Sequence, residues 1–273
     1  MDFLSAIILG FIEGLSAFLP VSSTGHMILG AKLLGLEQND TLKCFEVVIQ
    51  LGSILAVVAM FFRRLERDFS LLVKLALGFV PTGLIGLLLY KHIKALFVPN
   101  TVAYALIIGG VVFIVVELFR MRREKAANSA EDKSEQISTE LSDKDEIARI
   151  SYKQAFIIGL AQCLAMVPGT SRSGATIVAG LLCGLSRQGA AAFSFLLAVP
   201  TMLAATVYDS YKNRAIFIEN SENIWIFLLG GAVAFVVALV VLRLFLSFVS
   251  RFSYISFGVY RIIAGAVFLL FVL

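Results

Sequence analysis

The stretch Pro20-Val-Ser-Ser-Thr-Gly-His26 decides how this chain folds, together with a second stretch, Pro168-Gly-Thr-Ser-Arg-Ser-Gly-Ala-Thr176. Each one interrupts a long apolar segment, where charged and strongly polar side chains are rare unless they have a function. Between them they hold one histidine, one arginine, four serines and three threonines, which are residue types that bind phosphate. We name them the first motif (residues 20–26) and the second motif (residues 168–176).

Most of the chain around these motifs is apolar enough to lie in a membrane. The composition is 59% hydrophobic and 15% charged, whereas a soluble domain is about half apolar and about a quarter charged. A membrane-spanning helix needs about 20 apolar residues, and the mean hydropathy of +0.91 agrees with several such helices. Six segments are predicted to span the membrane: Phe45–Phe62, Leu71–Tyr90, Thr101–Phe119, Ala190–Tyr208, Ile224–Val241 and Tyr254–Leu273.

Two further apolar regions, Phe3–Leu36 and Tyr152–Leu185, are each broken in the middle by one of the motifs. An arm of about 17 residues rises only about 25 Å as a helix, which is marginal for a full span. Irregular polar backbone is tolerated at membrane depth only where it is buried in protein or faces water. Both regions are therefore predicted to be re-entrant helical hairpins. The alternative is a pair of ordinary turns between full helices, which seldom need these residue types.

One membrane domain, residues 1–273, is expected to contain two halves of the same design. Residues 1–119 and 151–273 each hold one hairpin followed by three spans, and a polar segment at residues 120–150 joins them. Because three is an odd number, the second half must be inverted relative to the first. The predicted fold class is an all-α integral membrane protein with six transmembrane helices and two re-entrant hairpins, arranged as two inverted-topology repeats.

The spacing between the motifs and two phenylalanines supports this repeat. Phe45 lies 25 residues after Pro20, and Phe193 lies 25 residues after Pro168. Inverted repeats whose broken helices meet near the membrane midplane are known mostly from transporters. Such an arrangement places the two motifs face to face.

Basic residues predict the orientation, because cytoplasmic loops carry an excess of lysine and arginine. The clusters are Arg63, Arg64 and Arg67, then Arg120, Arg122, Arg123 and Lys125, then Arg243 and Arg251. These ends are expected in the cytoplasm, which leaves both termini outside. The net charge of +4 then reflects orientation in the membrane and not nucleic-acid binding. Residues Ala126–Glu146 are polar and nearly neutral, which predicts a solvated cytoplasmic linker.

The motifs also predict an anion site. Hydroxyl groups, backbone N–H groups freed by glycine and helix N-termini all favour an anion. The candidate contacts are Ser22, Thr24, Gly25, Gly169, Ser171, Ser173, Gly174 and Thr176. Arg172 offers a planar fork that matches phosphate oxygens. His26 exchanges protons near neutral pH, and Ser22 or Ser23 lies four or three residues before it, so a serine nucleophile with a nearby base is expected. Together the two motifs fit phosphoryl transfer.

Glu13 is an ionisable residue inside the apolar helix before the first motif, which makes it a candidate functional residue. Its carboxylate can bind a divalent cation, hold His26 in one tautomer, or point to water at the membrane interface. Glu46 and Gln50 lie one helical turn apart on the next predicted span and share a face. They are expected either to line the same cavity or to contact a neighbouring helix.

Other residues exclude other kinds of site. Cys44, Cys163 and Cys183 form no Cys-x-x-Cys pattern, so neither a disulfide framework nor a zinc site is predicted. Two histidines are too few for a multi-histidine metal centre. Glu117 and Arg187 lie near predicted helix ends and are expected at the membrane interface.

The chain resembles the undecaprenyl-diphosphate phosphatases of the bacterial inner membrane over nearly its whole length. The resemblance is carried by Glu13-Gly-Leu, by the two motifs, by Phe45-Glu-Val-Val-Ile-Gln-Leu-Gly-Ser53 and by Phe193-Ser-Phe-Leu-Leu-Ala-Val-Pro200. It implies hydrolysis of undecaprenyl diphosphate, an isoprenoid membrane lipid, to the monophosphate, which recycles the carrier for peptidoglycan synthesis. It also implies bacitracin resistance, a divalent cation (Mg²⁺ or Ca²⁺) and an active site open to the periplasm. It is compatible with a homodimer.

Carried over residue by residue, the resemblance implies a role for each residue of the motifs. Ser23 would be the nucleophile and His26 its base, or, on a rival account, His26 would be the nucleophile itself. Arg172, with Ser171 and Ser173, would clamp the diphosphate. Glu13 would serve the metal.

Ala17 departs from the family pattern, which usually has a second glutamate one turn after the first. Two carboxylates at that spacing would face the same way and could share a metal. Three interpretations stand: an engineered inactive variant, a natural member that uses another ligand such as Glu46, or a second glutamate that matters little. The first is favoured, and it predicts poor hydrolysis that Ala17→Glu restores.

Two rival functions are weighed against the phosphatase. A transporter or flippase for the lipid carrier would fit the repeat architecture. The type-2 phosphatidic acid phosphatases also use Ser-Gly-His and Ser-Arg loops, but this chain lacks their second histidine followed by aspartate. A purely structural membrane protein would not explain the two motifs.

Overall fold

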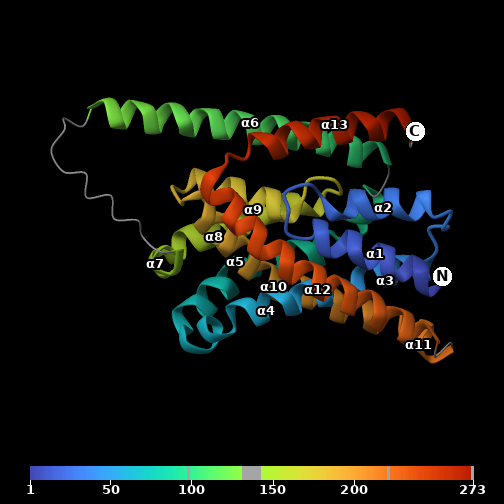
Figure 1. The fold of residues 1–273 in the computed structure, drawn as a ribbon. Helices are drawn as coiled ribbons and strands as arrows, with labels where there is room; N and C mark the ends of the chain where they lie inside the picture. The colour runs from blue at the N-terminus through green and yellow to red at the C-terminus, as the bar shows by residue number, and fades with distance from the viewer. Residues whose placement is uncertain (97–98, 131–142, 220–221, 272–273) are drawn as a thin grey trace.

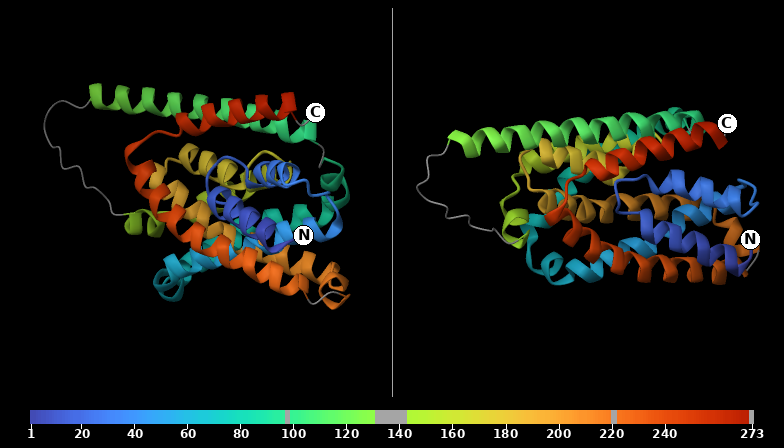
Figure 2. Two further views of the ribbon diagram at one scale, coloured as in Figure 1. Left: turned by 45° about the vertical axis from the view of Figure 1, so that its right-hand side comes forward. Right: turned by 45° about the horizontal axis from the view of Figure 1, so that its top comes forward.

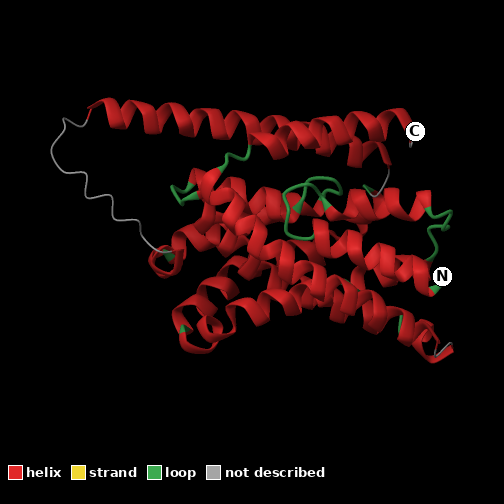
Figure 3. Ribbon diagram, in the orientation of Figure 1, coloured by secondary structure: helices red, strands yellow, loops and turns green. Residues whose placement is uncertain are grey.

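A computed structural model of the chain describes residues 1–96, 99–130, 143–219 and 222–271. All regular structure in these residues is helical, and the long helices run side by side (Figure 1, Figure 3). The first half contains α1 (Phe3–Ser16), α2 (Ser23–Leu33), α3 (Asp40–Val48), α4 (Gln50–Arg67), α5 (Phe69–Ala95) and α6 (Pro99–Ala130). The second half contains α7 (Asp143–Arg149), α8 (Tyr152–Gln162), the 3₁₀ turn η1 (Cys163–Met166), α9 (Arg172–Leu182), α10 (Arg187–Lys212), α11 (Ala215–Glu219), α12 (Glu222–Arg251) and α13 (Ile255–Phe271).

Five of the described helical segments are long and apolar enough to cross a membrane. They are Asp40–Arg67, Phe69–Leu89, Asn100–Arg123, Arg187–Lys212 and Ile224–Arg251. These segments contain the first five predicted spans almost entirely, and α13, a shorter apolar helix, covers most of the sixth. The chain is therefore an all-helical, multi-pass membrane protein. Both termini lie at one end of the helices and α7 at the other (Figure 1).

Each motif lies in a helix–loop–helix unit, and the helix that follows the loop has the same length in both units. The first unit is α1 and α2, and the second is α8 and α9; α2 and α9 both contain 11 residues. Each of these helices follows a serine in the left-handed region, Ser22 with φ 71° and Ser171 with φ 70°. Ser171 lies 149 positions after Ser22, and Gly184 lies 149 positions after Gly35, the positive-φ glycine that follows each unit.

The left-handed conformation of the two serines is costly, because a Cβ in this region crowds the following carbonyl. Such residues persist only where surrounding contacts over-determine the backbone, and they gather at functional sites. Ser22 and Ser171 are both buried. The structure therefore stores backbone strain at the same position of both motifs.

The two units pack on helices of the opposite half of the chain. α1 lies against α12, α8 lies against α5, and α6 lies alongside α13 (Figure 1, Figure 2). Glycines let these backbones approach closely, as small residues do between membrane helices. A Cβ at Gly159 of α8 would lie 2.1 Å from the carbonyl oxygen of Gly78 in α5. This packing fixes the position of each loop relative to the other half.

Two regions differ from the sequence predictions near the ends of helices. The predicted solvated linker, Ala126–Glu146, begins inside α6, which continues to Ala130, and its last residues lie in α7. Residues 131–142 of this prediction lie outside the described residues. Helical structure thus enters the polar segment from both sides.

Glu117 and Arg187 do not lie at the interface as isolated charges. Glu117 is completely buried and forms an ion pair with Arg187, whose Nε donates to Glu117 Oε1 over 2.6 Å. The hydroxyl of Tyr254 donates to the Arg187 carbonyl over 2.9 Å. A buried charge persists when it is paired in this way. The ion pair also joins α6 to α10.

Candidate active site

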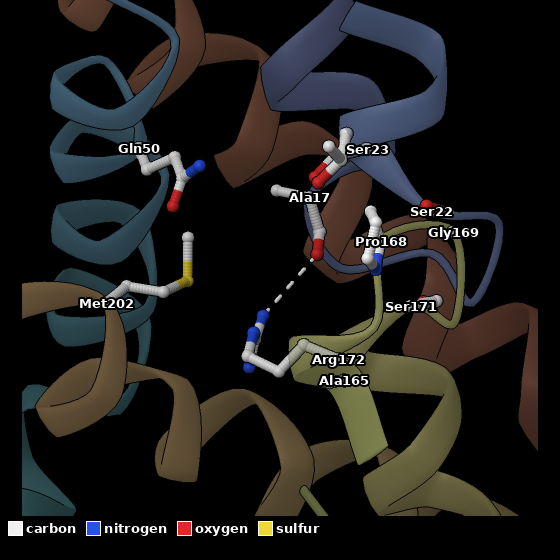
Figure 4. A pocket seen from close by; sticks show the side chains of 11 residues that line it. Ala17, Ser22, Ser23, Gln50, Ala165, Pro168, Gly169, Ser171, Arg172 and Met202 are labelled. Atoms are coloured by element: carbon white, nitrogen blue, oxygen red, sulfur yellow. Dashed lines mark hydrogen bonds between the residues drawn. The ribbon is translucent and has the colours of Figure 1, made fainter. Parts of the chain in front are cut away.

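A cavity of about 130 Å³ lies between the two motifs (Figure 4). Its walls come from both loops, from α4, from η1 and from α10. The lining residues are Ala17, Ser22, Ser23, Thr24, Gln50, Ala165, Pro168, Gly169, Ser171, Arg172 and Met202. The structure therefore brings the two motifs to one cavity, although residues Ser23 and Arg172 lie 149 positions apart in the sequence.

Arg172 is the first residue of α9 and points into the cavity (Figure 4). Nη1 donates to the carbonyl of Ser194 over 3.3 Å, and Nη2 donates to the carbonyl of Ala17 over 3.4 Å. The guanidinium also lies 5.8 Å from the ring centre of Phe18. Both hydrogen bonds are long, and together they use only part of the N–H donors of the guanidinium. The remaining donors can bind an anion.

The hydroxyl groups of the second motif mostly bind protein groups. Ser171 Oγ accepts from the N–H of Gly174 over 3.1 Å and caps α9. Ser173 Oγ donates to the Leu19 carbonyl over 2.9 Å, which ties the two loops together. Thr176 Oγ1 lies 2.6 Å from the hydroxyl of Ser194. Ser171 lines the cavity, whereas Ser173, Gly174 and Thr176 are buried around it.

The first motif places its hydroxyls differently. Ser22, Ser23 and Thr24 all line the cavity, and Ser22 makes no side-chain cap on α2. Gly25 faces away from the cavity, since a Cβ there would lie 3.4 Å from Cγ1 of Val102. The first motif therefore leaves serine and threonine hydroxyls open to the cavity, as a nucleophile requires.

Glu13 lies behind this wall and is completely buried. Neither carboxylate oxygen has a hydrogen-bond partner among the described residues. The groups that interact with it electrostatically are the guanidinium of Arg172, the carboxylate of Glu46 and the hydroxyl of Ser23. A buried carboxylate without hydrogen bonds is strongly destabilising unless a ligand or proton compensates it.

His26 does not line the cavity. Its Nδ1 lies 2.8 Å from the Ser22 carbonyl, and its Nε2 lies 2.6 Å from the hydroxyl of Tyr260. A carbonyl only accepts, so Nδ1 carries the proton and Nε2 accepts from Tyr260. The two rings are stacked at 5.7 Å with 11° between their planes. Both ring nitrogens are therefore engaged away from Ser23.

Glu46 and Gln50 have different neighbours. They lie on either side of Ile49, where α3 passes into α4; Ile49 keeps right-handed helical angles (φ −64°, ψ −18°), and the N–H of Gly52 bonds back three residues to it. Gln50 lines the cavity. Glu46 accepts a hydrogen bond from Gln38 over 3.2 Å and reaches Glu13 only electrostatically.

The comparisons with known proteins agree with this geometry. A family model described as bacitracin resistance protein BacA matches residues 6–267. The chain belongs to this family. A protein named undecaprenyl-diphosphatase from Campylobacter fetus subsp. fetus is 66% identical over 273 residues, which cover 100% of both chains. Proteins of the same name from Campylobacter hominis and Wolinella succinogenes are 64% identical over 273 residues (100% of both chains) and 53% identical over 272 residues (99% of this chain and 98% of the relative).

Two residues near the site of this BacA-family chain were not singled out from the sequence. Tyr260 binds His26, and its neighbour Arg261 is completely buried and binds both loops. Arg261 lies inside an apolar predicted span, and an ionisable residue there is a signal for function. Its partners could not be named from the sequence, because they lie between 91 and 241 positions away.

Proposed function

We propose that this chain hydrolyses undecaprenyl diphosphate to undecaprenyl phosphate and phosphate, and so recycles the lipid carrier and confers bacitracin resistance. The observation that carries the proposal is that Ser23 and Arg172, one from each motif, line a single cavity. A nucleophile and an anion clamp on opposite walls suit phosphoryl transfer, where positioning and charge stabilisation do most of the work. The names of the relatives support the same activity.

In the proposed reaction, Arg172 holds the terminal phosphoryl group and the hydroxyl oxygen of Ser23 attacks its phosphorus. The bond from this phosphorus to the bridging oxygen breaks, and undecaprenyl phosphate leaves with the bonding electron pair. Water then hydrolyses the phosphoserine to release phosphate. Ser171 and Thr24 are placed to bind the diphosphate oxygens, because both line the same cavity.

Two residues are candidates to take the proton of Ser23. His26 is the base that the family resemblance implies, and it must first exchange its contact with Tyr260 for one with Ser23. Glu13 is the second candidate, because its buried carboxylate lies near the Ser23 hydroxyl and makes no hydrogen bond to a described residue. A pH profile of phosphate release separates them: His26→Ala removes the ionisation if His26 is the base, whereas Glu13→Gln removes it if Glu13 is.

We also propose that Glu13 helps to hold a divalent cation, Mg²⁺ or Ca²⁺. The fit rests on its two buried carboxylate oxygens, which lack hydrogen-bond partners among the described residues. The described part of the chain holds no group of three or more histidine, cysteine and acidic side chains that could hold a metal alone. Such cations are often bound by one or two carboxylates together with substrate phosphates. Once bound, the cation would neutralise charge on the phosphates.

The membrane arrangement that we propose has six spans and two re-entrant hairpins in two inverted repeats. It is supported by the equal lengths of α2 and α9, by the strained serine before each, and by the exchanged packing of α1 on α12 and α8 on α5. The protein would lie in the bacterial inner membrane with the cavity open to the periplasm. Membrane-impermeant thiol labelling of single cysteines at residues 2 and 136 tests this: only the former should react in intact cells.

The deciding experiment is phosphate release from undecaprenyl diphosphate by the purified chain, with and without a chelator. Release by the unaltered chain, its loss in Ser23→Ala and Arg172→Ala, and its sensitivity to chelator are the expected results. A transporter of the lipid carrier is the second candidate, favoured by the repeated helix–loop–helix units. It predicts lipid flux in sealed vesicles that persists in Ser23→Ala.

A further inference from the structure

Arg261 of α13 is the largest side chain that is completely buried in the described residues. All five of its hydrogen bonds go to backbone carbonyl oxygens. The acceptors and distances are Pro20 at 3.0 Å, Gly169 at 3.1 Å, Thr170 at 2.9 Å, Ala105 at 3.2 Å and Leu106 at 3.4 Å. Three of these carbonyls belong to the two motif loops, and the other two belong to α6. One cation therefore binds both loops and the helix beside them.

The space around Arg261 is shaped for its guanidinium. A Cβ at Gly109 would lie 2.2 Å from Nη2, and a Cβ at Gly174 would lie 3.0 Å from Nη1. The ring of Phe113 lies 5.9 Å from the guanidinium carbon. Burial of an arginine at membrane depth is costly even when carbonyls bind it. The two glycines leave the space that the guanidinium occupies, which indicates that the fold is shaped to hold it.

The loop carbonyls that Arg261 binds lie one or two residues before the strained serines. Thr170 is followed by Ser171 with φ 70°, and Pro20 lies two residues before Ser22 with φ 71°. The carbonyl and the next N–H of one peptide point in opposite directions, so binding the Thr170 carbonyl turns the Ser171 N–H away from Arg261. Strain of this kind needs outside contacts that over-determine it, and Arg261 supplies such contacts to both loops.

We propose that Arg261 is a positioning residue that fixes the spacing between the two loops and thereby the alignment of Ser23 with Arg172. The proposal rests on the proposed hydrolase function for its kinetic consequence, but its structural part stands alone. Among the residues that line the cavity, Arg261 donates a hydrogen bond only to Gly169, through the backbone carbonyl of that residue. It is therefore distinct from Arg172, which faces the phosphate.

The kinetic test is carried out on the full-length purified chain. Arg261→Met should lower kcat for undecaprenyl diphosphate by about 100-fold, as a small misplacement of reacting groups does, and should change KM little because Arg172 remains. Arg261→Lys keeps the positive charge but loses the planar guanidinium with its several N–H donors, and should recover part of kcat. Thermal unfolding checks that each variant is folded.

A second variant tests the position of the Arg261 side chain without removing its positive charge. Gly109→Ala leaves Arg261 in place but pushes a methyl group against its Nη2, so it should lower kcat with the same small change in KM. The matched control is Gly231→Ala, where a Cβ would meet nothing within 4 Å. This control should keep the activity of the unaltered chain.

Loop spacing is measured without activity by cross-linking. Cysteines at Thr24 in the first motif and at Ala165 in η1, just before the second motif, both line the cavity, and they are joined with a short bifunctional thiol reagent in a chain whose native cysteines are serine. Arg261→Met should slow cross-linking, while Arg172→Ala should abolish phosphate release and leave cross-linking unchanged.

The outcomes separate the two proposals. If the unaltered chain releases no phosphate, the proposed function fails, and cross-linking still decides the role of Arg261. The positioning proposal is overturned if Arg261→Met leaves kcat and cross-linking unaltered, or if it lowers kcat while cross-linking stays the same.

Discussion

The two helix–loop–helix units share one backbone design but differ in what their side chains leave available. In the second unit, the hydroxyl of Ser171 caps α9, whereas in the first unit Ser22 makes no cap and its neighbours Ser23 and Thr24 face the cavity. The helices that precede the two loops, α1 and α8, differ in the same way. Glu13 of α1 is buried without a hydrogen bond, while Gln162, the residue 149 positions later, donates to hydroxyl groups.

This difference assigns separate tasks to units of the same shape. The first unit carries an ionisable residue and open hydroxyls, so it can supply the reacting groups. The second unit carries a neutral amide and a hydroxyl used as a cap, and adds one cation, Arg172, that faces the cavity. A repeat of one scaffold thus yields a site with unlike walls, as transfer of a charged group requires.

The largest effect is expected from removing the cation of the second unit. Arg172→Ala should lower kcat/KM for undecaprenyl diphosphate by about 1,000-fold, because a preorganised charge at the phosphate is lost. Arg172→Lys is the matched control and should recover only part of the loss, since a point charge does not reproduce the fork. Near-normal turnover in Arg172→Ala would show that the second unit does not bind the phosphate.

The two serine-bearing loops can be compared directly with paired alanine variants. Ser23→Ala should reduce kcat by at least about 100-fold, because the proposed nucleophile is gone. Ser171→Ala should chiefly lower stability, by about 1 kcal/mol, through loss of the α9 cap. Phosphate release and thermal unfolding of both variants check this. Equal kinetic losses would mean that the loops do not have separate tasks.

Ala17 offers a way to sharpen the comparison by adding charge to the first unit. Ala17 lines the cavity and its carbonyl binds Arg172, so Ala17→Glu would place a second carboxylate near Glu13. The substitution should raise phosphate release roughly tenfold. It should also lower the concentration of divalent cation needed for half-maximal release, because an added ligand group strengthens cation binding. A chelator titration measures both, with Ala17→Gln as the uncharged control. Full activity of the unaltered chain would contradict the expectation.

The smallest kinetic effect is expected at Gln162. Its amide nitrogen donates to Thr82 and Thr201, each over 3.0 Å, and none of these three residues lines the cavity. Gln162→Leu should cost about 1–3 kcal/mol of stability because the buried hydroxyl of Thr82 and the half-buried hydroxyl of Thr201 lose a partner, and it should leave KM and kcat almost unchanged. A large fall in kcat would show that the second unit also contributes to catalysis.

Much of the architecture was predictable because polar residues interrupt apolar segments in a way that few folds accept. The all-helical fold was predicted from this pattern and is confirmed by the structure, in which Ser23 and Arg172, one from each motif, line one cavity. The local tightening of the helix at Ile49, where α3 passes into α4, was not predicted, because no proline or glycine marks it. The burial of Glu117 was missed because its partner lies 70 positions away.

The surroundings of His26 show the same limit. The sequence places His26 near Ser23, but the structure pairs its ring with Tyr260, which lies 234 positions later. Arg261 likewise binds carbonyl groups, which every residue has, so no sequence pattern identifies its partners. Contacts between side chains and distant backbone carbonyls depend on how helices pack, and packing was only coarsely predicted.

The position of α13 has a consequence for biosynthesis. Tyr260 and Arg261 lie on the last helix of the chain, yet they hold groups in the first and second loops. α1 also packs on α12, which is made long after it. During translation the early loop therefore lacks its packing partner until α12 is made and its anchors until α13 is made. A chain that stops before α13 would leave both loops without these anchors, so the site forms only after α13 has been synthesised.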